Sequence, residues 1–337
     1  MKRIATLLLC VLGLSVLAQA QNDGKKFRFS FDARMDWEAT ASTQKNEDFA
    51  SSFNGKSFNL NVSGELNESF SYRFRQRLIK SADNNFSQIF KATDLLYLDY
   101  KINHSFSLRA GKQAVAIGGW EYDRAPIDLY YMSAFSYNVG CYQMGVMANW
   151  YSENGKHNIG FQISNSPFTS KAMQNLYAYN LIWYGDMGFW KTIYSANRVE
   201  YTKRQYINYV ALGNKFEFNP FVLEVDYTDR FSFNQDNPMK DYTLIGNLIY
   251  NVCDKLSLYC KAGIDQNKAQ EQNINPALYY DQYVQPGSSY KFWGLGAEFY
   301  PIKSSKNVRL HCYWWRNTDN LHHNYFNIGL SWKGMTF

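Results

Sequence analysis

Beyond residue 20 the sequence contains no apolar run long enough to cross a membrane as a helix, which requires ~20 predominantly apolar residues. It has only 5 cysteines and no Cys-x-x-Cys pair, which excludes a disulfide-dense scaffold. The 7 prolines are few enough to permit long uninterrupted strands. A formal net charge of +6 is too small to favour nucleic acid as a partner, and we expect none.

Catalytic and metal-binding motifs are also missing. The sequence has no Gly-x-Ser-x-Gly, no Walker-type loop and no His-Glu-x-x-His. Its 5 histidines cannot be assembled with Ser or Asp into a catalytic arrangement from the sequence, and the pair His322–His323 lacks further ligands at suitable spacing. We therefore expect no catalytic residue, no metal and no cofactor, and keep an enzyme only as an alternative.

Residues 1–20 have the features of a cleaved export signal. A short positive region precedes the apolar run of residues 4–17, and the tripeptide 18–20 (Ala-Gln-Ala) supplies the small-x-small pattern of a cleavage site. The apolar run is too short for a transmembrane helix. The sequence thus predicts a signal peptide over 1–20 and one mature domain over 21–337.

Aromatic residues are what the chain has in abundance. They make up 18% of it, with 27 Tyr, 24 Phe and 9 Trp, although the mean hydropathy is negative. A transmembrane β-barrel combines these properties, because its lumen is polar, its outer surface is apolar and both membrane interfaces carry aromatic girdles. The candidate girdle residues are Trp150, Tyr151, Trp183, Tyr184, Trp314, Trp315 and Trp332.

Period-two alternation over segments of about ten residues is the strongest signal. Apolar residues occupy alternate positions from Phe27 to Trp37, and polar or charged residues occupy the positions between them, from Arg28 to Glu38. A soluble β-sandwich also alternates, but its apolar face fills a core with side chains of mixed size. The clustering of Trp and Tyr near strand ends favours the membrane barrel instead.

The number of strands follows from parity. Seventeen segments could form strands, but single-chain bacterial barrels have an even number, with short periplasmic turns and longer external loops. Short and long loops alternate along the chain, and the alternation counted from the first strand agrees with that counted from the last strand only if 127–136 is not a strand. Residues 115–140 then form one long external loop. We predict an all-β fold, a transmembrane antiparallel β-barrel of about 16 strands with an inward-folded third external loop. Alternation is weakest over 176–215.

The stretch LRAGKQAVAIGGWEYDRAPIDLYYMSAF, residues 108–135, resembles the phosphate-selective porin O and P family, in which a strand ending in a Gly-Lys or Gly-Gln step leads into a Gly-containing loop. The resemblance implies a homotrimeric diffusion channel in the bacterial outer membrane, with basic pore-lining residues. It also implies contact with outer-membrane lipid, with the barrel assembly machinery and with small hydrophilic solutes or anions. Phosphate, other anions and sugars stay open as solutes.

Basic side chains face the predicted lumen on the first, third and fifth strands. Consecutive inward positions lie ~6.6 Å apart, so three arginines in one strand form a ladder for phosphate or carboxylate groups, which guanidinium binds in a bidentate manner. The alternative is that inward carboxylates such as Asp32, Asp36, Glu38, Glu65 and Asp99 pair with these bases. The predicted pore-lining bases are Arg28, Arg34, Arg73, Arg75, Arg77, Arg109 and Lys112.

The loop 115–140 is the predicted constriction, with Trp120, Glu121, Asp123, Arg124 and Asp128 as its candidate residues. The acids of the loop, together with Glu224 and Asp226 on the opposite wall, would create a transverse electric field across the lumen, directed from the basic side chains of the first, third and fifth strands to these acids.

Three alternatives stay open for this chain. The loop aromatics Trp120, Tyr122, Tyr130 and Tyr131 could stack on sugars, which would make a saccharide-accepting porin, or could pin the loop to the wall. A structural or adhesive barrel is a further possibility outside transport. The cysteines are expected to be small lipid-facing residues, with a Cys253–Cys260 bridge undecided.

Overall fold

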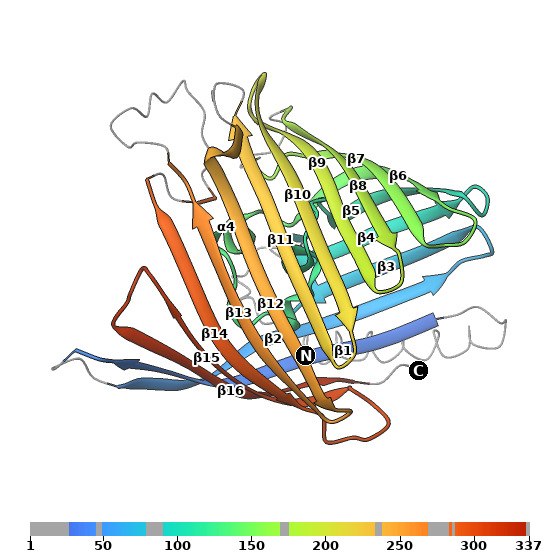
Figure 1. Ribbon diagram of the computed structural model, residues 1–337. Helices are drawn as coiled ribbons and strands as arrows, with labels where there is room; N and C mark the ends of the chain where they lie inside the picture. Colours follow the sequence, from blue (N-terminus) through green and yellow to red (C-terminus); the bar gives the residue numbers. More distant parts are fainter. Residues whose placement is uncertain are drawn as a thin grey trace, which may run out of the picture.

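The chain forms a closed antiparallel β-barrel of sixteen strands, in which each strand pairs with its neighbours in sequence and β1 closes the ring against β16 (Figure 1). The computed structural model describes residues 27–44, 49–78, 90–168, 175–232, 238–268, 283–284 and 287–334. The fold class and the strand count predicted from the sequence are confirmed. The predicted signal peptide, 1–20, lies outside the described residues.

The elements follow in chain order, and helices are short and few. The strands are β1 (Phe27–Ser42), β2 (Ala50–Glu65), β3 (Phe70–Arg77), β4 (Thr93–Lys101), β5 (Phe106–Ala114), β6 (Tyr142–Tyr151), β7 (His157–Asn165), β8 (Tyr177–Asp186), β9 (Trp190–Thr202), β10 (Gln205–Phe218), β11 (Phe221–Ser232), β12 (Asp241–Cys253), β13 (Leu256–Gln266), β14 (Ser289–Phe299), β15 (Val308–Asn317) and β16 (His323–Lys333). The helices are α3 (Trp120–Asp123), η2 (Pro126–Asp128), α4 (Ala134–Asn138) and η3 (Pro238–Lys240). Within the described residues, no helix is both long and apolar enough to span a membrane.

The two ends of the barrel differ in the length of their connections. At the end where β1 begins and β16 finishes, neighbouring strands are joined by short turns, such as residues 219–220 between β10 and β11. At the other end the connections are mostly longer, and the longest described one joins β5 to β6. In bacterial barrels the short turns are periplasmic and the long loops external.

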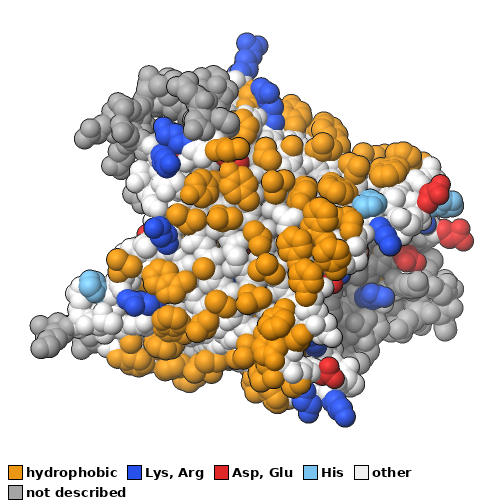
Figure 2. All heavy atoms as spheres, in the orientation of Figure 1, with side chains coloured by type: hydrophobic (Ala, Val, Ile, Leu, Met, Phe, Trp, Pro, Cys, Tyr) orange, Lys and Arg blue, Asp and Glu red, His pale blue; other side chains and the backbone are white. Residues whose placement is uncertain are grey.

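Alternation sorts the side chains as the sequence predicts. On β1, Met35 is 57% exposed, whereas its neighbours Arg34 and Asp36 are 3% and 1% exposed because they face the interior. Figure 2 shows the resulting outer surface, where apolar side chains form a broad band over β9–β13. Such a band is what a lipid-facing wall requires.

The cysteines resolve the open disulfide question. Cys141, Cys253, Cys260 and Cys312 are all free, and the last three are exposed. Cys260 pairs across the sheet with Leu248, five positions before Cys253, which is ~16 Å along a strand at ~3.3 Å per residue. A disulfide needs Cα atoms about 6 Å apart, so the register of β12 and β13 excludes this bridge.

The predicted girdle needs one correction. Adjacent strand residues face opposite sides of the sheet, so only one member of each aromatic pair can face lipid. Trp150 is 39% exposed on the outer face, but its neighbour Tyr151 lines an internal cavity, as Tyr184 does. Trp315 also faces inward and stacks on Tyr131 with ring centroids 5.7 Å apart. These inward aromatics serve the interior rather than the membrane interface.

Candidate functional site

The segment between β5 and β6, residues 115–141, contains α3, η2 and α4 and makes polar contacts with inward-facing side chains. Residues 127–136, excluded as a strand from the sequence, do not form one. On β9, Ser195 Oγ accepts the Gly118 N–H at 2.8 Å. On β11, the Asp226 carboxylate accepts the N–H groups of Trp120 and Glu121, both at 2.8 Å. The first half of the segment is therefore held against β9–β11.

Glu121 is the buried charge of this segment. Its carboxylate accepts hydrogen bonds from the Lys261 ammonium on β13 and from the Ser133 hydroxyl, the latter at 2.5 Å. Burial alone would raise the pKa of Glu121, but the Lys261 charge and the hydrogen bonds outweigh it and lower that pKa below its usual value. Glu121 is thus held ionised and fixes the segment to β13.

The second half of the segment reaches the opposite wall. Arg34 on β1 donates from Nη1 to the Leu129 carbonyl at 2.6 Å, and Arg309 on β15 pairs with Asp128 at 2.7 Å. Tyr130 stacks on Tyr313 of β15 with ring centroids 3.8 Å apart. Because β1 and β9 lie eight strands apart in a ring of sixteen, the segment contacts walls on opposite sides of the barrel.

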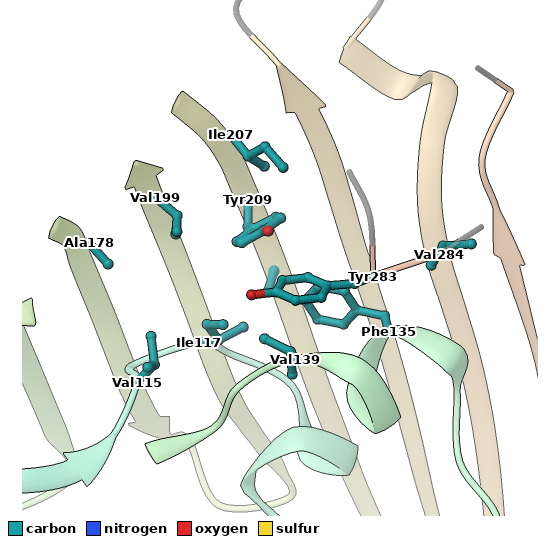
Figure 3. Close-up of a cluster of buried hydrophobic side chains, with 11 residues drawn as sticks. Val115, Ile117, Phe135, Val139, Ala178, Val199, Ile207, Tyr209, Tyr283 and Val284 are labelled. Carbon is teal, nitrogen blue, oxygen red and sulfur yellow. The ribbon is translucent and has the colours of Figure 1, made fainter. Parts of the chain in front are cut away.

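An apolar cluster backs the segment on the side of β8–β10. Figure 3 shows Val115, Ile117, Phe135 and Val139 facing the apolar side chains that point inward from these strands. The inward residues of the cluster are Ala178, Val199, Ile207, Tyr209 and Ala211. The inward face of these strands therefore carries apolar as well as polar residues, which explains why their alternation is poor in the sequence.

Between the segment and the wall of β3–β8 a cavity of about 390 Å³ remains open. Four arginines but only one carboxylate, Asp123, line it. A second cavity of about 310 Å³ lies towards the short-turn end and shares Arg73 and Tyr97 with the first. The basic residues of the first cavity are Arg73, Arg75, Arg109 and Arg124.

The predicted arginines differ in their partners. Arg75 and Arg77 both pair with Asp94, at 2.9 Å and 2.8 Å, and Asp94 is fully buried. Arg109 pairs with Asp99 at 2.7 Å. Within the described residues, no ion pair or side-chain hydrogen bond holds Arg73. The three-arginine ladder is therefore partly neutralised, and Arg73 is its free member.

Two further predicted bases, Arg34 and Arg28, differ most in burial and pairing. Arg34 is 3% exposed, and its guanidinium pairs with Asp36 at 2.6 Å as well as holding the segment. Arg28 lines the second cavity, and in the described part of the chain no carboxylate pairs with it. Arg28 and Arg73 thus carry the unpaired positive charge of the cavities.

Lys112 does not line the pore, and the prediction that it does is wrong. On β5 it stands opposite Leu96 and Met144, which face outward and are 47% and 42% exposed. Its ammonium donates to the Phe90 carbonyl at 2.7 Å. The strand parity that turns Arg109 inward turns Lys112 outward, because the two are three positions apart.

The predicted constriction residues mostly hold the segment in place. Trp120 lies beneath the Lys215 ammonium, 3.8 Å from its ring centroid, and Arg124 pairs with Glu224 at 2.5 Å. Asp123 faces the open cavity, and burial raises its pKa although Lys215 opposes the shift. Asp265 on β13 accepts the Ala134 N–H at 2.8 Å. The segment's partners Lys261, Asp265 and Arg309 and the cavity residues Tyr97 and Asn149 were not predicted from the sequence. Their inward parity was visible in the alternation of their strands.

The sequence resembles one known family of porins over part of its length. A sequence model of the phosphate-selective porin O and P family matches residues 26–189, the part of the chain that carries the segment and most of the cavity wall. Over these residues the chain is similar to that family. It is an outer-membrane porin.

Solved structures share the fold of this porin. The anion-selective porin from Comamonas acidovorans superposes with a TM-score of 0.59 at 10% identity, covering 93% of this chain and 100% of that one. OmpT of Vibrio cholerae, expressed in the outer membrane, gives 0.58 at 12% identity, with 92% and 98% covered. Its trimer form gives 0.57 at 12% identity, with 92% and 99% covered. No curated protein matches the porin in sequence.

Proposed function

We propose that this porin is a diffusion channel with a preference for small anions, and that its narrowest passage runs between residues 115–141 and the wall of β3–β8. The observation that carries the proposal is the 390 Å³ cavity, which four arginines and a single carboxylate line. Arginines lining a pore favour anions, because guanidinium stays charged and binds oxyanions through paired N–H groups. Resemblance in fold to an anion-selective porin agrees with this preference.

Arg73 is the main contributor to the preference in this proposal. The carboxylates of Asp94, Asp99 and Glu224 offset part of the charge of the other cavity arginines. Arg73 has no such partner in the described part of the chain, and it lines both cavities. An anion moving between the cavities would pass its guanidinium.

The saccharide alternative is weakened, because three of its four candidate residues are held by other side chains, and only Tyr122 lines the 390 Å³ cavity. Tyr130 stacks on Tyr313, Tyr131 stacks on Trp315 and Trp120 lies under Lys215. These contacts pin the segment to the wall, so the rings are not free to stack on a sugar. We also propose that the porin is exported by its 1–20 signal, acts as a homotrimer, in keeping with the trimer form of OmpT, and carries no catalytic site.

The test is the reversal potential across a KCl gradient in planar bilayers. Wild-type porin should prefer chloride, and Arg73→Gln should shift the reversal potential towards cation preference. Lys303→Gln is the matched control, since it removes one positive charge from the turn between β14 and β15, away from the 390 Å³ cavity. An Arg73→Gln channel with wild-type selectivity contradicts the proposal.

The constriction is tested separately by conductance. Deleting residues 118–128 removes α3 and η2 and should raise single-channel conductance, because the segment no longer occupies the lumen. Heat-modifiable mobility on a gel checks that the shortened chain still forms a barrel. Unchanged conductance in a folded deletion variant would place the limiting passage elsewhere.

A further inference from the structure

One arginine is exposed on the outer wall of the barrel. Arg198 on β9 lies between Asn197 and Val199, whose side chains are buried inside, so its own side chain points outward. Across the sheet it stands in register with Tyr179 of β8 and Asn208 of β10. A charged side chain on the lipid-facing wall is strongly unfavourable at mid-membrane and costs almost nothing at the interface, so the depth of Arg198 matters.

The position of Arg198 is at the external edge of the membrane band. Aromatic rings mark the periplasmic edge, where Trp190 stacks with Phe216 at the start of β9 and the end of β10. Arg198 follows Trp190 by eight positions, which is ~26 Å along a strand and ~20 Å of height at a tilt of ~40°. The apolar band of such barrels is ~25 Å tall, and an arginine side chain can extend several Å to reach its edge.

The guanidinium of Arg198 lies on an aromatic ring and not on a carboxylate. Its Cζ is 4.2 Å from the centroid of the Tyr206 ring. Glu200, two positions along the strand, is only 6% exposed, and its oxygens accept the N–H groups of Tyr177 and Arg204 at 3.1 Å and 2.9 Å. In the described residues, then, Arg198 has no carboxylate to neutralise it.

Further positive charge lies directly above. Lys203 and Arg204 form the exposed turn between β9 and β10, and Figure 2 shows Lys and Arg side chains projecting above the apolar band at this end of the two strands. Asp229, an acid on the neighbouring β11, is only 7% exposed. The external rim here is thus positive, with tyrosines below it.

We propose that Arg198, Lys203 and Arg204 bind the phosphate groups of a phosphorylated glycolipid in the outer leaflet. The headgroup phosphates of such a lipid lie at the level of the rim, and its acyl chains would run down the apolar wall past Tyr179. Guanidinium groups bind phosphate through paired, charge-assisted hydrogen bonds, which explains an arginine on the outer wall close to its external edge. The site lies on the outside of the barrel and is separate from the pore.

The binding is measured by native mass spectrometry of the folded porin released from detergent, titrated with diphosphorylated lipid A. Arg198→Gln should weaken binding about 10-fold, the loss expected for one charge-assisted hydrogen bond, whereas Arg198→Lys should lose less. Lys203→Gln with Arg204→Gln should weaken binding further. The matched control is Lys303→Gln with Lys306→Gln, which removes two charges from a periplasmic turn and should leave binding unchanged.

Several outcomes would overturn the proposal. If Arg198→Gln bound lipid A with wild-type affinity, the arginine would not contribute to binding. If the wild-type porin bound a phosphate-free glycolipid as tightly as lipid A, the phosphates would not be recognised. Either result would leave only the aromatic side chains as the lipid contact. Displacement of the bound lipid by inorganic phosphate alone would indicate a site for free phosphate instead. A change of oligomeric mass in Arg198→Gln would show that this face binds a second copy. Unchanged conductance in the same variant confirms a folded pore, so failure of this proposal is distinct from failure of the channel proposal.

Discussion

Gly213 on β10 and Gly119 of the segment are in direct backbone contact across the barrel interior. A Cβ built on Gly213 would lie 2.7 Å from the Gly119 Cα, closer than real Cβ atoms approach. Gly119 itself has φ 106°, a conformation that favours glycine. The segment therefore reaches β10 because Gly213 carries no side chain and because glycine at 119 can adopt this φ.

Gly213→Ala should loosen the segment. The added methyl group meets backbone rather than a flexible side chain, and overpacking of this kind costs ~1–3 kcal/mol. We expect a lower unfolding temperature and faster trypsin cleavage after Arg124 in the folded barrel. Gly246→Ala is the control, because a Cβ at Gly246 on β12 would meet nothing within 4 Å. Equal cleavage of the two variants would show that the contact is not limiting.

The Glu121–Lys261 pair should behave as a buried anchor. Glu121→Gln leaves the Lys261 ammonium, whose other hydrogen bond is to the Tyr131 carbonyl, without its charge partner. Removing one member of a buried pair costs ~3–5 kcal/mol, while removing both costs less. The free energies of unfolding of Glu121→Gln, Lys261→Met and the double variant should therefore be non-additive. Additive effects in this cycle would contradict the anchor.

The same pair gives a pH dependence. Because the folded pKa of Glu121 lies below its usual 4.5, ionised Glu121 stabilises the fold fully above the unfolded pKa, and this stabilisation is lost as the pH falls through the lower, folded value. Single-channel recordings should keep a steady open level at neutral pH and become noisy only well below pH 4.5. Glu121→Gln channels should be noisy at neutral pH and show no such transition. A wild-type transition above pH 5 would point to another group.

Alternation in the sequence predicts which side chains of β1 face the lumen, but it does not do so for β8–β10 in the middle of the chain. One face of β1 meets lipid and the other meets the polar lumen, so the alternation of residues predicts that Arg34 faces inward and Met35 faces outward. On β8–β10 the inward side meets the apolar face of the segment, and Ile193 and Ile207 are buried there. A contact with a distant segment decided these residue types, and no local pattern reveals it.

The sequence likewise predicts which arginines of β3 face inward, but it does not predict their ion-pair partners. The inward parity of Arg73, Arg75 and Arg77 could be read from the sequence, but the partner of the last two could not. Asp94 stands out of phase with the inward Leu95 and Tyr97, and it reaches the arginines at a register shift between β3 and β4 next to Arg75. Such a shift has no signature in the sequence. The free charge of Arg73 therefore emerged only from the structure.

Asp94→Asn should increase anion preference, and this gain is the strictest test of how the lumen charge is arranged. Asp94 accepts hydrogen bonds from Arg75 Nη2 at 2.9 Å and pairs with Arg77 Nε at 2.8 Å, so it neutralises two arginines at once. Asparagine keeps the size and an acceptor oxygen but removes the negative charge. One unit charge at ~4 Å in water is worth ~1 kcal/mol, so the anion-to-cation permeability ratio should rise up to roughly five-fold.

The measurement for Asp94→Asn is the reversal potential in a KCl gradient, with Glu153→Gln as control, because Glu153 is an exposed acid in the turn between β6 and β7. Combining Asp94→Asn with Arg75→Gln should return selectivity towards the wild type, since Arg75 lines the cavity and Arg77 does not. A fall in anion preference in the single variant would mean that Asp94 positions the arginines for anions rather than neutralising them. That result would shift the selective role from Arg73 to the Arg75–Asp94 pair.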